Sequence, residues 1–287
     1  MASAASSIGP PPPVAGASPH NDSDDGAVPK RPRLSASSTV TPIDSIAPDL
    51  RADAKGAISQ LFGIDTPRDL QMEVIHHCAY NDNAVVYVNA KTAEGKSLCP
   101  LTVAAMRRGV AIILVPLIGL GSDQVAKASR ADHNIEAYHI DEHKGPNAYA
   151  LRERYRAYNK EESKHVIILS FINPQSLKRD PSKPNRGWFQ TFSDLAEQDL
   201  ISLICINEAH TVEQCGRSFR PEFLEAVTNL RLIREKMPNP APFIAMSATF
   251  RQCDQDRITK LMKFKQPPAV VAGSLARRDI MWTTIKK

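Results

Sequence analysis

The stretch AVVYVNAKTAEGKS, residues 84–97, decides the fold of this chain. Its apolar run at 85–88 predicts a buried strand, and residues 98–106 can form a helix with one apolar face. A helix that begins directly after Gly-Lys-Ser offers unpaired backbone N–H groups and the positive end of its dipole, which together suit a phosphate. The stretch therefore predicts a strand, a phosphate-binding loop and a helix.

Seven consecutive residues of this loop are predicted to bind a nucleotide. Lys96 is expected to reach the β- and γ-phosphates of ATP, and the Ser97 hydroxyl is expected to hold Mg²⁺. Ala90 stands where this pattern usually opens with Gly, and the Cβ of Ala93 adds further bulk beside the phosphates. The predicted contacts are Lys91, Thr92, Ala93, Glu94, Gly95, Lys96 and Ser97.

Composition narrows the class of protein. The 287 residues carry a net charge of +5, a mild basic excess that permits nucleic-acid binding without showing it. The five cysteines form no CxxC pair, which favours reduced thiols in an intracellular protein over a zinc site. No apolar run reaches the roughly 18 residues that a membrane span needs, so we expect no membrane partner.

Residues 1–46 are predicted to be a disordered, low-complexity arm. Eight of the 22 prolines lie there, with few large apolar residues to bury. The basic cluster Lys30-Arg31-Pro32-Arg33 is typical of a nuclear import signal, and a solvated charge run is the alternative. We expect a folded domain at 47–273, followed by the start of a linker at 274–287.

The folded part alternates strands and helices. Apolar runs predict strands at 85–88, 110–115, 135–140, 166–169, 200–206 and 243–246. Helical spacing predicts helices at 50–62, 67–79, 98–106, 117–131, 147–159, 221–236 and 253–262. This alternation predicts an α/β fold, a mostly parallel sheet with helices on both faces. Ligands of such sheets bind at the carboxyl ends of the strands, where the polar clusters of this chain lie.

Six segments carry a family resemblance: 62–71, 115–125, 173–177, 206–223, 245–250 and 274–280, the fourth containing Asn-Glu-Ala-His and the fifth Ser-Ala-Thr. Together with the phosphate loop, they resemble the first motor domain of a superfamily-two helicase, most closely the RecQ family of ATP-dependent DNA helicases. The similarity covers about residues 55–283. It implies a single RecA-like P-loop domain of a 3′–5′ DNA helicase that binds ATP, Mg²⁺ and single-stranded or forked DNA.

The resemblance also implies roles for individual residues. Gln71, with Arg68 beside it, would read adenine. Glu208 would polarise the attacking water, and His210 would relay the nucleotide state to the DNA side. Ser247 and Thr249 would couple hydrolysis to movement. The implied DNA contacts are Pro116, Gln124, Asn173, Gln175, Phe219 and Arg220.

Two departures from the family pattern bear on activity. Asn207 replaces the acid that holds Mg²⁺ through water, and an amide cannot supply that charge. Cys215 replaces an aromatic residue expected to stack on DNA, a contact worth about 1–3 kcal/mol per base. The family's arginine fingers lie in a second motor domain, which residues 1–287 do not include. The resemblance leaves three possibilities open: a fragment, a degenerate copy of a helicase, or one half of an assembly in which a second chain supplies that domain. We therefore expect weak ATP binding and slow or no hydrolysis.

Alternatives stay open at this point. A non-catalytic module that binds nucleotide or DNA and regulates a partner is favoured by Asn207, whereas the overall similarity favours a helicase. A small-molecule P-loop kinase has less support, because no lid-like cluster of arginines is visible and the Asn-Glu-Ala-His segment fits it poorly. A purely structural α/β domain stays open as a minor alternative.

Overall fold

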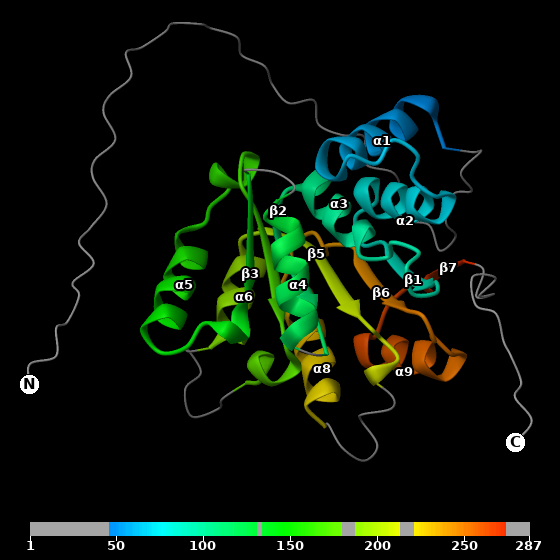
Figure 1. Ribbon diagram of the computed structural model, residues 1–287. Coiled ribbons are helices and arrows are strands. Elements are labelled where there is room, and N and C mark those ends of the chain that lie inside the picture. Colours follow the sequence, from blue (N-terminus) through cyan, green and yellow to red (C-terminus); the bar gives the residue numbers. More distant parts are fainter. Residues whose placement is uncertain (1–45, 117, 131–133, 180–186, 213–220, 274–287) are drawn as a thin grey trace, which may run out of the picture. The chain divides into compact units, whose positions relative to one another are not determined.

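A seven-stranded parallel sheet forms the centre of the computed structural model (Figure 1). The structure describes residues 46–116, 118–130, 134–179, 187–212 and 221–273. The strand order is β3-β4-β2-β5-β6-β1-β7, and every described pair of neighbouring strands runs parallel. The predicted α/β fold with a parallel sheet is confirmed.

The strands are β1 (Val85–Asn89), β2 (Gly109–Leu114), β3 (Ile135–His139), β4 (Ile167–Ile172), β5 (Ile201–Asn207), β6 (Phe243–Ser247) and β7 (Ala269–Ala272). The helices are α1 (Pro48–Phe62), α2 (Asp69–Tyr80), α3 (Leu98–Arg107), α4 (Ile118–Ala128), α5 (Pro146–Ala157), α6 (Trp188–Glu197), α8 (Pro221–Glu235) and α9 (Gln252–Met262). Three short 3-10 helices lie between these elements in the described residues: η2 (Ile140–Glu142), η3 (Glu162–Lys164) and η4 (Pro174–Leu177).

Apart from β7, whose second face is exposed, the strands direct side chains into two cores, one on each face of the sheet. In β1, Val85 and Tyr87 join a core with the apolar sides of α5, α6, α8 and α9. Val86 and Val88 join the other core, with α1, α2 and α3. Because both faces are covered, the strands read as continuous apolar runs, which is why the sequence reveals them. The prediction of helices on both faces is confirmed.

Two elements lie outside the elements predicted from sequence. The helix α6 packs Trp188, Phe192 and Leu195 on one core. The strand β7 is four residues long and pairs with β1 at the sheet edge. Apart from Ile46, which is buried, the predicted arm with its basic cluster lies outside the described residues, as does the predicted linker at 274–287. Within the described part, no helix combines the length and apolar character that crossing a bilayer requires.

The strand order brings the polar ends of three strands together. The strand β6 lies between β1 and β5, so the loops after these three strands meet at the carboxyl ends of the strands. Backbone bonds tie them: Ala90 N donates to Ser247 O at 3.1 Å, and Ala209 N donates to Met246 O at 3.0 Å. The phosphate loop, the Asn-Glu-Ala-His segment and the Ser-Ala-Thr segment are therefore neighbours.

Candidate active site

The loop after β1 wraps around the side chain of Lys96. The ammonium donates to Ala90 O at 2.6 Å and to Lys91 O at 2.9 Å, and the side chain is buried. Ser97 follows at the N-terminus of α3, and its side chain is exposed. A cation held by loop carbonyls at a helix start is placed to exchange these partners for phosphate oxygens.

The electrostatics place Glu208 near this ammonium. Burial lowers the pKa of Lys96, while the Glu208 carboxylate, and more weakly Glu94, act in the opposite direction. Such influence requires proximity because the interaction falls with distance. The structure thus brings together the two residues, on different loops, that are predicted to flank the triphosphate.

The segment after β5 makes a short polar chain. Asn207 is buried, and its Oδ1 accepts from Glu208 N at 3.0 Å. His210 Nδ1 lies 3.4 Å from Glu208 Oε2 and 2.7 Å from Ser247 Oγ. Ser247 Oγ also accepts from Thr249 N at 3.0 Å. The chain joins Glu208 to the predicted coupling residues, Ser247 at the end of β6 and Thr249 in the loop after it.

Gln71 uses both ends of its amide inside the protein. Its Oε1 accepts from Arg68 N at 2.9 Å, and its Nε2 donates to Glu94 O and Gly95 O, each at 3.3 Å. The Arg68 guanidinium also donates to Ala93 O at 3.3 Å. The pair predicted to read adenine therefore grips the phosphate loop here, a contact that no local signal in the sequence reveals.

The loop itself departs from the usual backbone and charge of a phosphate cradle. Ala93 has a φ of 69°, in the left-handed region that glycine adopts without strain. Lys91 and Glu94 form an ion pair at 3.9 Å, and Thr92 is exposed. Glu94 therefore sets one negative charge against the loop's two lysines.

The predicted DNA contacts lie at the carboxyl ends of β2 and β4. Pro116 is buried and Gln124 in α4 is half-buried. Asn173 is buried, whereas Gln175 in η4 is exposed. Because β2 and β4 are neighbouring parallel strands, the segments that follow them lie next to each other at the carboxyl ends of the strands. Phe219 and Arg220 lie outside the described residues, as does Cys215.

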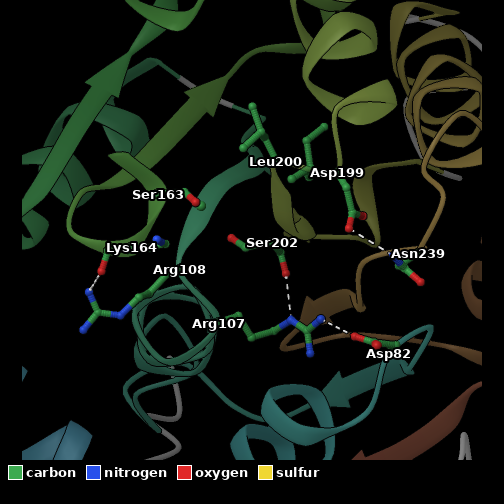
Figure 2. A pocket seen from close by; sticks show the side chains of 11 residues that line it. Asp82, Arg107, Arg108, Ser163, Lys164, Asp199, Leu200, Ser202 and Asn239 are labelled. Atoms are coloured by element: carbon green, nitrogen blue, oxygen red, sulfur yellow. Dashed lines mark hydrogen bonds and ion pairs between the residues drawn. The ribbon is translucent and has the colours of Figure 1, made fainter. Parts of the chain in front are cut away.

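A separate hollow of about 280 Å³ lies at the amino ends of β2 and β5, the end of the sheet opposite to the loop of Lys96. Figure 2 shows an ion pair between Arg107 and Asp82 and a hydrogen bond from Asn239 to Asp199. The Arg108 guanidinium donates to Lys164 O. This hollow lies across the sheet from the loop of Lys96, and we assign it no part in the chemistry.

Comparison with known proteins places these features in a family. The DEAD/DEAH box helicase family matches residues 68–257. The rat ATP-dependent DNA helicase Q5 is 27% identical over 235 residues, which are 82% of this chain and 22% of that protein. The ATP-dependent DNA helicase RecQ of Pasteurella multocida is 27% identical over 238 residues, 83% of this chain and 34% of that protein. The chain thus spans between about a fifth and about a third of these relatives' length.

A solved structure shows the same fold. The DUF1998 helicase MrfA, bound to DNA, superimposes with a TM-score of 0.55 at 20% identity, over 86% of this chain and 30% of that chain. Mycobacterium smegmatis Lhr, a helicase bound to single-stranded DNA and AMP-PNP, has a TM-score of 0.50 at 16% identity, over 78% of this chain and 27% of that chain. At these identities the likeness concerns the fold alone, and it confirms the predicted RecA-like fold.

Proposed function

This chain belongs to the DEAD/DEAH box helicase family, and we propose that it is an ATP- and DNA-binding motor domain of the RecQ type, impaired in hydrolysis. The observation that carries the proposal is that Glu208 lies close enough to Lys96 to oppose the lowering of its pKa, and that Glu208 also adjoins the chain of His210 and Ser247. Two loops from separate strands supply these groups at the edge where parallel sheets bind ligands.

Within this proposal, the residues of the chain bind and orient the nucleotide. Lys96 exchanges the carbonyls of Ala90 and Lys91 for β- and γ-phosphate oxygens, while the N–H groups at the start of α3 face the same phosphates. Glu208 orients a water toward the γ-phosphate. His210 bonds Ser247, so a shift of Glu208 reaches the loop after β6 through one side chain.

The proposed Mg²⁺ ligands are oxygen atoms without charge. Ser97 offers a hydroxyl and Asn207 an amide oxygen, both of a kind that Mg²⁺ accepts. The Asn207 oxygen already accepts the Glu208 N–H at 3.0 Å. Mg²⁺, when bound with ATP, would neutralise phosphate charge. With no carboxylate at position 207, we propose that metal and triphosphate bind weakly and that hydrolysis is slow or absent.

The same substitution favours a second candidate function. A module that binds nucleotide or DNA without hydrolysis, and thereby regulates a partner, needs Lys96 and the DNA contacts but no charge at position 207. A second chain that supplies the other motor domain would be one such partner. Nuclear import through the cluster at 30–33 remains a prediction.

Titration of the chain with ATP, once in Mg²⁺ and once in EDTA, tests the proposed nucleotide binding. We expect Lys96→Ala to abolish ATP binding, and Lys260→Ala, an exposed lysine of α9, to leave it unchanged. Equal ATP affinity of Lys96→Ala and the unaltered chain would refute the proposal.

Single-turnover hydrolysis, with and without single-stranded DNA, separates the two candidates. Turnover that DNA stimulates and Lys96→Ala abolishes supports the motor domain. ATP binding without turnover, persisting in Asn207→Asp, supports the regulatory module.

A further inference from the structure

A polar corner joins the two segments that are proposed to contact DNA. It consists of His139 at the end of β3 and of Asp141 and Glu142 in η2, and we call it the β3 corner. Asp141 accepts two bonds from the segment that contains Gln175: Asn173 N donates to Oδ2 at 2.8 Å, and Ser176 Oγ donates to Oδ1. One carboxylate therefore holds the start of η4 in place.

The other side of the β3 corner holds α4. Ser122 Oγ donates to Glu142 Oε1. The ring of His139 lies between the acids, with Nδ1 3.4 Å from Glu142 Oε1 and Nε2 3.6 Å from Asp141 Oδ2. The α4 backbone touches this ring, because a Cβ on Gly121 would lie 2.6 Å from its Cδ2. The buried imidazole leaves little freedom between α4 and β3.

By charge alone, the two carboxylates of the β3 corner would oppose DNA binding at the neighbouring segments. Nucleic-acid affinity comes largely from cations on phosphates, so two carboxylates beside a DNA path weaken binding by electrostatics. Their hydrogen bonds act in the opposite sense, because they fix α4 and η4 relative to each other. A DNA backbone must meet both elements at once, and fixed spacing avoids an ordering cost on binding.

We propose that Asp141 and Glu142 are positioning residues that hold α4 and η4 at the spacing of a single-stranded DNA backbone. This inference rests on the proposed function, since it presupposes DNA at Gln124 and Gln175. It assigns a role in DNA binding to residues that touch no DNA and whose charge opposes it.

The test is fluorescence anisotropy with labelled oligo-dT over a range of salt concentrations. Asp141→Ala breaks two bonds to η4, and we expect about fivefold weaker binding or more. We expect the slope of log affinity against log salt to stay nearly unchanged, because Asn173 and Gln175 carry no charge and release no counterions when they contact a phosphate. Electrostatics alone predicts tighter binding instead. The control Asp123→Asn removes an exposed acid of α4, and its binding should stay equal or tighten.

Two neutral variants keep the inference testable if Asp141→Ala does not fold. Ser176→Ala and Ser122→Ala each remove one bond to the β3 corner without changing charge, and each should weaken binding about threefold. Unchanged or tighter binding by the folded corner variants overturns this inference alone, provided the unaltered chain binds oligo-dT. If the unaltered chain does not bind, the proposed DNA function falls together with it.

Discussion

Replacing Gln71 with leucine tests whether this residue reads adenine or organises the phosphate loop. In the structure its Nε2 holds the carbonyls of Glu94 and Gly95. A trans peptide directs its N–H away from its C=O. Holding these two carbonyls on the Gln71 side therefore turns the N–H groups of Gly95 and Lys96 toward the other side, where phosphates would lie.

The expected magnitude follows from the two bonds that leucine removes. At 3.3 Å both are long, so together they contribute about 1–2 kcal/mol. If the phosphate-binding conformation of the loop loses that much stabilising free energy, the dissociation constant for ATP rises about five- to thirtyfold.

The assay compares ATP with inorganic tripolyphosphate by isothermal titration calorimetry. Loop organisation predicts that Gln71→Leu weakens both by the same factor, because both carry the phosphates that the loop holds. Gln190→Leu is the matched control, since that amide bonds Asp194 within α6. A loss for ATP with unchanged tripolyphosphate binding would refute the reasoning and restore Gln71 as an adenine contact.

Three further predictions concern other residues. Asn207→Asp should strengthen ATP binding in Mg²⁺ but not in EDTA, and equal gains in both buffers would contradict a metal role. His77 is buried, and burial lowers its pKa from 6.5 to about 4, so the unfolded chain takes up this proton first as the pH falls. Stability should therefore drop by about 2 kcal/mol between pH 7 and 5, an effect that urea denaturation should find missing in His77→Phe. A double-mutant cycle with His210→Ala and Ser247→Ala should give a coupling of about 1 kcal/mol in thermal unfolding, and simple additivity would argue against their bond.

The sequence predicts most of the sheet because buried parallel strands are continuous apolar runs. The strand β7 escapes detection, since its four residues alternate between buried and exposed and follow two prolines. The helix α6 carried a detectable signal, with Trp188, Phe192 and Leu195 at helical spacing. Strand order needs contacts between distant residues, which a single sequence does not contain.

The residues of the candidate site also divide into those that a local motif predicts and those that only the folded structure reveals. The loop motif indicates Lys96, and the Asn-Glu-Ala-His segment indicates Glu208, because local spacing carries their chemistry. The bond of Gln71 to the loop and the contacts of Asp141 join segments more than 20 residues apart. Asp141 stands in no recognisable motif, so only the packing of η2 against η4 reveals it.

The end of β7 is joined mechanically to the nucleotide loop. Gly273 N donates to Asn89 O at 2.9 Å, and a Cβ at this glycine would lie 2.6 Å from Glu94 Oε2. Tension applied to the chain beyond residue 273 would therefore act on β7 and on the end of β1, directly before the loop that carries Lys96. A load on that segment, applied with optical tweezers, should change how long a nucleotide stays bound before it unfolds the sheet.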